Sequence, residues 1–284
     1  MKGFFIVWLL LLSFSVFAQN AEDFEFREGK SGGKAVVAIL RYKGNAKNVV
    51  VPAEINGIPV NNVVGFEDNT TLESVTISAG IQRLGKFAFK GCTNLSRVSF
   101  LGEIREMGAE AFARCDSLRS FTLPNGLRGV PSGIFMHCKN LTEVKLPAGM
   151  TINIGSSAFY GCESLETIRI PEGIYDIGAD SFSHCTKLKN VNLPSTITKI
   201  SNRAFANCTG LQSITLPGSL ETIETYAFQQ CGALASITLP PAVKTVERLA
   251  FWECKSLKTV ELSRSAQIHA DAFRDAPVNL VYYD

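Results

Sequence analysis

Eight cysteines are the residues of this 284-residue chain with the greatest potential for chemistry. They follow one another at intervals of 23 residues, with one interval of 24, and each stands three positions after a phenylalanine. Thiols in an ordered array can form disulfides or hold a metal ion. The cysteines are Cys92, Cys115, Cys138, Cys162, Cys185, Cys208, Cys231 and Cys254.

The equal spacing of the cysteines argues against a disulfide framework. If the repeats stack as strands about 4.8 Å apart, neighbouring Cβ atoms are farther apart than the roughly 3.5 to 4.5 Å of a disulfide. We therefore favour a ladder of buried thiols, each a small apolar side chain that accepts weak hydrogen bonds from its turn. Pairing of adjacent cysteines under oxidation stays open as an alternative, because the Cα separation alone allows it.

The sequence contains no metal-site spacing. No two cysteines lie within the short separation that zinc sites use, and no histidine is placed to complete a ligand set. We therefore expect no metal and no other cofactor.

The three histidines offer little for acid–base catalysis. His137 and His184 stand just before a cysteine, where other repeats carry Arg114 or Gln230, and His269 falls in the irregular last repeat. A position with such different side chains is typical of solvated surface. The chain also lacks a glycine-rich phosphate loop and a nucleophile elbow, so we expect a protein that is not an enzyme.

The cysteines mark one position of a longer repeat. Three residues after each comes a leucine and then a short apolar–polar alternation such as Val144-Lys145-Leu146, often closed by proline. This pattern predicts strands of three or four residues that pair in parallel with their copies. The phenylalanines should stack behind that sheet. They are Phe89, Phe112, Phe135, Phe159, Phe182, Phe205, Phe228 and Phe251, with Phe66 and Phe273 in the first and last repeats.

Together these elements predict a solenoid of about ten coils with one continuous parallel β-sheet on one face. The return path carries apolar pairs such as Leu220 and Ile223. We expect it to form short irregular or 3-10 segments on the other face.

The repeated unit, Leu-x-x-Ile-x-Leu-Pro followed by Ala-Phe-x-x-Cys, resembles the BspA-like bacterial leucine-rich repeats, including treponemal proteins with a 23-residue unit. The resemblance covers residues 48–284. It implies a curved leucine-rich repeat solenoid, export, and binding of proteins or cell surfaces, without indicating a particular partner.

Two segments precede the repeats. Residues 1–18 combine Lys2, an apolar run and a small residue at Ala18, which is typical of a signal peptide. Residues 19–47 alternate around a glycine-rich turn, which predicts an N-terminal β-hairpin cap on the repeat domain, residues 48–284. No long apolar run follows, so we expect no membrane span in the mature chain. The protein should be exported, either secreted or on the cell surface, with the periplasm as the alternative.

The charge pattern excludes some partners. The formal net charge is +2, or +1 without Lys2, and no run of five basic residues occurs. We therefore expect neither nucleic acid nor a polybasic membrane patch as a partner.

The outward strand positions of the concave sheet are the candidate ligand-facing residues. Charge concentrates in the middle of this face, and no aromatic residue occupies it, which favours a broad or multivalent contact with an extracellular or cell-surface protein. A solvated face of good strand formers is the alternative interpretation. In function, we weigh an adhesin-like binding protein against a periplasmic scaffold that associates with itself or an envelope component. The candidates are Arg97, Ser99, Thr122, Glu143, Lys145, Thr167, Arg169, Asn190 and Asn192.

Overall fold

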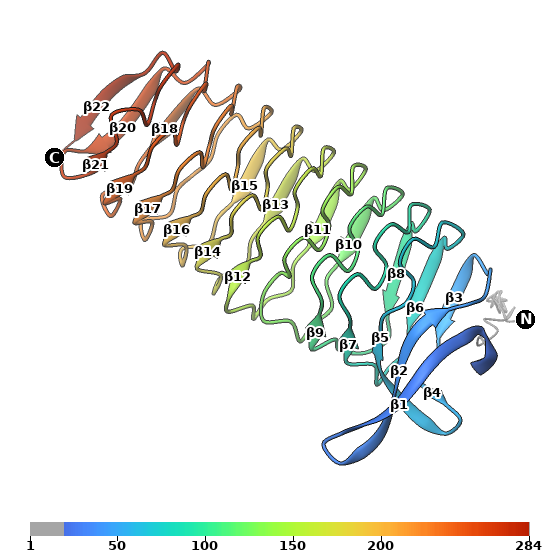
Figure 1. Cartoon of the computed structure of the whole chain (residues 1–284). Helices are drawn as coiled ribbons and strands as arrows, with labels where there is room; N and C mark the ends of the chain where they lie inside the picture. Colours follow the sequence, from blue (N-terminus) through green and yellow to red (C-terminus); the bar gives the residue numbers. More distant parts are fainter. Residues whose placement is uncertain (1–19, 284) are drawn as a thin grey trace, which may run out of the picture.

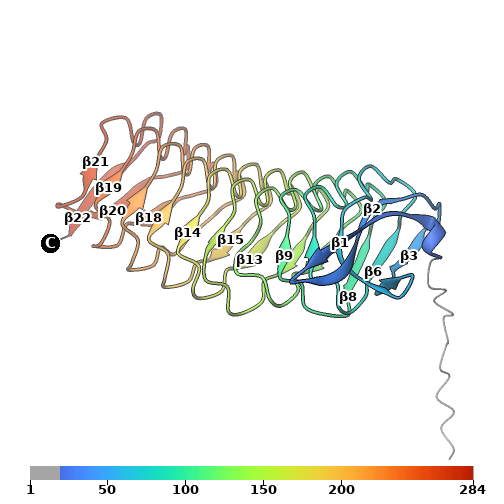
Figure 2. The same cartoon turned by 60° about the horizontal axis from the view of Figure 1, so that its bottom comes forward.

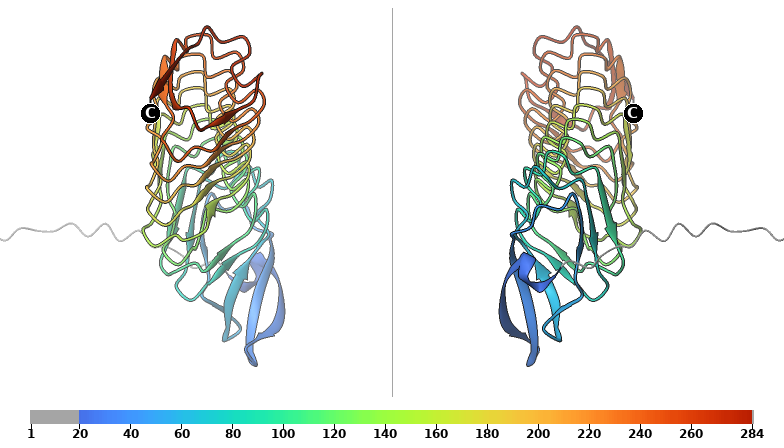
Figure 3. Two further views of the ribbon diagram at one scale, coloured as in Figure 1. Left: turned by 90° about the vertical axis from the view of Figure 1, so that its left-hand side faces the viewer. Right: turned by 90° about the vertical axis from the view of Figure 1, so that its right-hand side faces the viewer.

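The computed structural model describes residues 20–283, so the predicted signal peptide lies outside the described residues. The described chain is a β-solenoid of about 11 turns, stacked along one axis (Figure 1). This confirms the predicted leucine-rich repeat solenoid. Viewed along the stack, the coils overlie one another and a β-hairpin projects at the N-terminal end (Figure 3).

One side of the coils carries the longer strands, and we call their outer surface the strand face (Figure 2). Apolar residues at alternate positions of these strands point into the core, and polar residues point out, as in Val144 between Glu143 and Lys145. The strands are β3 (Asn48–Val51), β6 (Ser74–Ile77), β8 (Arg97–Phe100), β10 (Ser120–Thr122), β11 (Glu143–Lys145), β13 (Thr167–Arg169), β15 (Asn190–Asn192), β18 (Ser236–Thr238), β20 (Thr259–Ser263) and β22 (Asn279–Tyr283).

The predicted continuous sheet is instead divided into parallel patches. The patches are β3-β6-β8, β10-β11, β13-β15 and β18-β20-β22, and the expected strand around Thr215 does not form. The break between β11 and β13 coincides with the 24-residue interval from Cys138 to Cys162. One extra residue in that coil disturbs the register that equal repeats would otherwise keep.

A second ladder of short parallel strands runs along another side of the coils. We had expected only irregular or 3-10 segments there. Because one apolar residue of each return path stacks on its copy in the next coil, the adjacent backbones pair as short strands. These strands are β5 (Ile58–Val63), β7 (Arg83–Leu84), β9 (Glu106–Met107), β12 (Asn153–Ile154), β14 (Asp176–Ile177), β16 (Lys199–Ile200), β17 (Thr222–Ile223), β19 (Thr245–Val246) and β21 (Gln267–Ile268). All but β5 have two residues, and the ladder is divided between β9 and β12.

The N-terminal segment begins with a short 3-10 helix, η1 (Ala21–Asp23), and then forms the predicted hairpin of β1 (Phe24–Ser31) and β2 (Lys34–Tyr42). Strand β2 pairs in parallel with β5, so the hairpin extends the second ladder. A two-residue strand, β4 (Glu54–Ile55), pairs antiparallel with β5. No helix among residues 20–283 is long and apolar enough to cross a bilayer.

The core contains a column of phenylalanine rings from Phe66 to Phe273. Rings of neighbouring coils stack with centroids 4.9 to 6.3 Å apart. In the regular part, between Phe182 and Phe205, the planes are within 3° of parallel. Each ring fills the space between sheet and turn, so burial of the column links every coil to its neighbours.

Backbone hydrogen bonds form a further ladder beside these rings. From Phe89 to Phe251, the residues two positions before and two after each phenylalanine of the column have a left-handed backbone, as in Arg203 (φ 52°) and Asn207 (φ 59°). In this geometry the N–H groups of Phe205 and Asn207 both donate to carbonyl oxygens of the next coil, at 2.8 Å. The turn is therefore held by its backbone, which leaves its side chains free to vary.

Candidate binding surface

All nine predicted ligand-facing residues lie on the strand face, on β8, β10, β11, β13 and β15. Eight of their side chains are exposed and Ser99 is half-buried. The parallel register places Thr167 beside Asn190 and Arg169 beside Asn192, so polar side chains form rows that run from coil to coil.

The structure brings five of the nine residues together around one hollow of about 680 Å³. They belong to β11, β13 and β15, which lie in the middle of the stack (Figure 1). The five are Glu143, Lys145, Thr167, Arg169 and Asn192. Apolar atoms of Val144, Ile168 and Ile170 also line it, with Pro171 and Pro194. The hollow therefore combines an apolar surface with charged and hydrogen-bonding groups.

A second hollow of about 510 Å³ continues the first toward the C-terminal coils. Thr167 and Asn192 line both, and Asn190, Thr215 and Pro217 line the second alone. We call the two together the strand-face groove. It includes six of the nine candidates, and the other three, Arg97, Ser99 and Thr122, lie outside it.

The groove has mixed electrostatics. Glu143 and Lys145 form an ion pair at 3.3 Å, but both side chains are more than half exposed, so the pair contributes little to stability. Arg169 has no ion-pair partner among residues 20–283. At the rim, Glu172 accepts hydrogen bonds from the Ser195 N–H and hydroxyl, at 3.2 and 3.0 Å. The unpaired guanidinium is thus the group most available to a carboxylate of a partner.

The groove also uses residues that the sequence interpretation missed. Leu146, Ala148 and Gly149 line its first hollow, and they belong to the coil that follows Cys138 and is one residue longer than the others. That irregular interval was visible in the sequence. A coil of unequal length does not match its neighbours in register, so it is one place where a hollow is expected.

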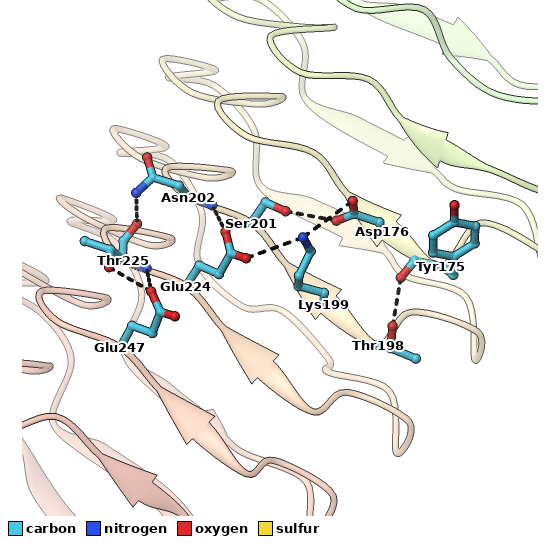
Figure 4. Close-up of polar contacts among 9 residues, drawn as sticks. All are labelled: Tyr175, Asp176, Thr198, Lys199, Ser201, Asn202, Glu224, Thr225 and Glu247. Carbon is cyan, nitrogen blue, oxygen red and sulfur yellow. Dashed lines mark hydrogen bonds and ion pairs between the residues drawn. The ribbon is translucent and has the colours of Figure 1, made fainter.

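The second ladder carries a polar network of a different kind (Figure 4). Lys199 lies between Asp176 and Glu224, at 3.9 and 3.4 Å, and Ser201 donates to Asp176 at 2.9 Å. The other oxygen of Glu224 accepts the Asn202 N–H at 2.9 Å. Each group binds the coil before or after it, so this network holds coils together.

The cysteines lie inside the solenoid, away from both faces. All eight are buried free thiols. The sequence did not predict that the thiols act as donors: each donates to the carbonyl oxygen of the phenylalanine one coil earlier, at 2.9 to 3.2 Å. Burial raises the pKa of Cys92 and of Cys138 to about 12, so both are kept protonated.

In the first coil, Asn69 takes the cysteine position. Its side-chain oxygen accepts the N–H groups of Thr71 and Leu72, both at 3.0 Å.

The histidines lie outside the strand-face groove. His137 is half-buried with its ring against Tyr160, and burial, then Arg114, lowers its pKa. His184 and His269 are exposed. Within residues 20–283, no three His, Cys, Asp or Glu side chains are arranged to hold a metal ion.

Comparison with known proteins places these observations in a family. The model of the "BspA type Leucine rich repeat region" matches residues 62–153 and 152–279. A leucine-rich repeat protein of T. pallidum is 28% identical, with 68% of this chain and 90% of that chain covered and a TM-score of 0.59. A leucine-rich cell surface protein of Faecalibacterium prausnitzii is 21% identical, with coverage of 91% and 95% and a TM-score of 0.43. A leucine-rich repeat protein of Bacteroides ovatus is 19% identical, with coverage of 92% and 98% and a TM-score of 0.41. Comparison with curated proteins gives no match.

Proposed function

Because this chain belongs to the BspA-type leucine-rich repeat family, we propose that it is an exported, non-enzymatic protein that binds an extracellular or cell-surface protein in an adhesin-like manner. The leucine-rich repeat scaffold is consistent with a protein-binding role. The binding site is the strand-face groove.

The composition of the groove is the observation that carries this proposal. Partly exposed apolar side chains such as Leu146 and Pro171 are flanked by Arg169, Asn190 and Asn192, so an apolar surface lies beside hydrogen-bonding groups. Protein interfaces have this arrangement of apolar core and polar rim. The groove extends across several coils, which suits an extended or broad partner surface better than a small molecule.

Arrangement of the reactive side chains supports a function without catalysis. Catalysis needs a nucleophile or base within reach of a partner group in a cleft. The thiols are buried, and His137 lies in a turn against Tyr160 rather than in the groove. The charged residues of the groove are exposed, as expected for groups that contact a partner.

A pair of variants on the same face tests the site. Residues 20–284 should be produced with R169A/N192A, which changes the groove, or with R97A/S99A, which changes β8 outside it. Binding to arrayed secreted and cell-surface proteins, measured by surface plasmon resonance, should weaken about tenfold for the first variant alone. Equal losses in both variants, or none in R169A/N192A, would place binding elsewhere.

The second candidate function is that of a periplasmic scaffold that associates with itself or with an envelope component. The exposed apolar residues Val281 and Tyr282 on β22, 41% and 45% accessible, favour it. Protease and antibody accessibility of the native protein on intact cells separates the two functions, with a known periplasmic protein as control and the culture medium assayed in parallel. Cleavage outside, or release into the medium, supports the adhesin-like function. Protection until the envelope is broken supports the scaffold.

A further inference from the structure

A basic hollow lies on the second ladder near the N-terminal end. The strands β7 and β9 of that ladder lie on a different side of the coils from β10 and β11 of the strand face (Figure 1). The hollow has a volume of about 570 Å³ and is lined by Arg83, Arg105 and Arg128. A smaller hollow of about 190 Å³ adjoins it, shares Arg83, and adds Arg27 and Lys30 from the hairpin. We call these five residues, with the two hollows that they line, the basic hollow.

Stacking of coils produces this cluster from residues far apart in the sequence. Arg83, Arg105 and Arg128 belong to successive coils, and β2, β5, β7 and β9 pair in that order, which places the hairpin at the same ladder. No run of basic residues marks the site in the sequence. The expectation of no polybasic patch rested on the absence of runs of basic residues in the sequence. It therefore did not account for basic side chains that lie far apart in the sequence and are brought together by stacking of the coils.

The floor of the basic hollow is backbone. The outward position of the second ladder is occupied by Arg83 and Glu106 in two coils, and by Gly129 in the next. A Cβ atom on Gly129 would come within 2.9 Å of the Asn153 carbonyl oxygen, so close packing of the longer coil requires glycine there. With no side chain at Gly129, the backbone of this coil and of Asn153 lines the hollow beside Arg105 and Arg128.

The charges of the basic hollow are not balanced internally. Five basic side chains and two acidic ones, Glu28 and Glu106, line it, which gives a net charge of +3. Arg83 pairs with Glu106 at 2.8 Å. In the part of the chain that the structure describes, Arg105 and Arg128 have no ion-pair partner, and both are exposed. Unpaired guanidinium groups in a row present forked donors suited to sulfate and carboxylate.

We propose that the basic hollow binds a linear acidic polysaccharide, whose sulfate or carboxylate groups the arginines of successive coils engage. The arginines lie on consecutive coils along the solenoid axis, so a chain with an anionic group on most of its units meets one guanidinium after another. This activity is separate from protein binding in the strand-face groove.

Other polyanions fit the hollow less well. Single-stranded nucleic acid binds through aromatic stacking platforms, and none of the described residues lining the two hollows is aromatic. An extended peptide usually adds main-chain hydrogen bonds, but the Gly108 and Val130 N–H groups already donate to neighbouring coils, at 2.8 and 3.0 Å. A bilayer presents its charges in a plane, which does not follow a hollow. Recognition by side-chain guanidinium alone favours the polysaccharide.

The test compares two double variants with the same loss of charge. R105Q/R128Q removes the two unpaired arginines, and R114Q/R119Q removes two exposed arginines outside the hollow. Affinity for a heparin-type sulfated polysaccharide, measured by calorimetry and by salt elution from a column, should fall about tenfold in R105Q/R128Q and stay near wild type in R114Q/R119Q. Salt should weaken wild-type binding, because the contacts are solvent-exposed charges.

Three outcomes would overturn the proposal. Equal loss in both variants would show a response to net charge alone. Absence of wild-type binding at low salt would exclude the polysaccharide outright. The third outcome is tighter binding of polyglutamate, oligothymidylate or phosphatidylserine vesicles than of the polysaccharide. If R105Q/R128Q also weakened that binding, the hollow would be assigned to another class of polyanion. Circular dichroism of each variant confirms that its fold is intact.

Discussion

The thiol of Cys208 donates a hydrogen bond to the carbonyl oxygen of Phe182, one coil earlier, across 3.1 Å. The same oxygen accepts the N–H of Cys185, also at 3.1 Å. A carbonyl oxygen has two lone pairs, and here the turn uses one and the next coil uses the other. The repeated cysteine therefore completes the hydrogen bonding of the phenylalanine backbone inside an apolar core.

Replacement of Cys208 by alanine should lower the free energy of unfolding by about 1 to 2 kcal/mol, because it removes this bond and leaves space where sulfur was. Urea unfolding followed by circular dichroism measures the change. Gln212→Ala, an exposed change nearby, should shift stability by less than about 0.5 kcal/mol. Equal effects of the two substitutions would contradict a structural role for the thiol.

Thiol reagents should not modify the native protein. Burial raises the pKa of Cys92 and Cys138 to about 12, so only about one thiol in 10⁴ is ionised at pH 8. Titration with a chromogenic disulfide reagent should give no rapid reaction in buffer and eight equivalents after denaturation. Fewer than eight in non-reduced, denatured protein would reveal the disulfide alternative.

Stability should fall at alkaline pH. Folding raises the pKa of Cys138 from its ordinary value of 9.0 to about 12, so above pH 9 the unfolded state binds fewer protons than the folded state. The contribution of Cys138 to the free energy of unfolding is fully present below pH 9 and is lost as the pH rises toward 12. When the pH is raised from 8 to 10, the free energy of unfolding should fall by about 1.4 kcal/mol less in Cys138→Ala than in the wild type. Urea unfolding at pH 8 and at pH 10 measures the difference. Identical losses would show that another group causes the alkaline transition.

Phe205→Ala should lower the free energy of unfolding by about 3 to 5 kcal/mol, because the ring is fully buried between Phe182 and Phe228. The centroids of these two rings lie 5.2 and 5.3 Å from that of Phe205. Phe205→Leu, which keeps most of the volume, should cost less. Denaturant midpoints of both variants test this order. A wild-type midpoint for Phe205→Ala would mean that the ring column does not stabilise the stack.

The sequence was sufficient to predict the repeat architecture because each coil repeats the same physical requirements. Alternation around residues such as Val144 predicted the strand face, and the spacing of Phe205 and Phe228 predicted neighbouring rings. The second ladder was missed, because two-residue strands such as β16 have no periodicity of their own. Their pairing depends on neighbouring coils, which no single repeat reveals.

The groove and the basic hollow were predictable only in part. The outward positions of Arg169 and Asn192 follow from strand alternation, but the selection of six candidates over Arg97, Ser99 and Thr122 depends on where coils leave space. Arg105 and Arg128 form a cluster only when the coils are stacked. The 24-residue interval between Cys138 and Cys162 is the feature of the sequence that indicates an irregular coil. That coil lines both the strand-face groove and the basic hollow.

The second ladder should depend on carboxylates that bind backbone of the preceding coil. Glu247 accepts the Thr225 N–H at 2.9 Å and the Thr225 hydroxyl at 2.8 Å through one oxygen (Figure 4). Glu247→Ala leaves that half-buried N–H without its acceptor, so the free energy of unfolding should fall by about 1 to 2 kcal/mol. Glu247→Gln keeps an acceptor oxygen and should lose less.

The exposed Glu163 provides the control for Glu247, since its carboxylate makes no hydrogen bond or ion pair within residues 20–283. Glu163→Ala should leave the urea midpoint unchanged within error. Hydrogen exchange adds a local measurement, because loss of the acceptor should speed exchange of the Thr225 amide more than that of amides in distant coils. If Glu247→Ala and Glu163→Ala behaved alike in both measurements, the carboxylate would be a solvated surface group, and ring and backbone stacking alone would hold these coils together.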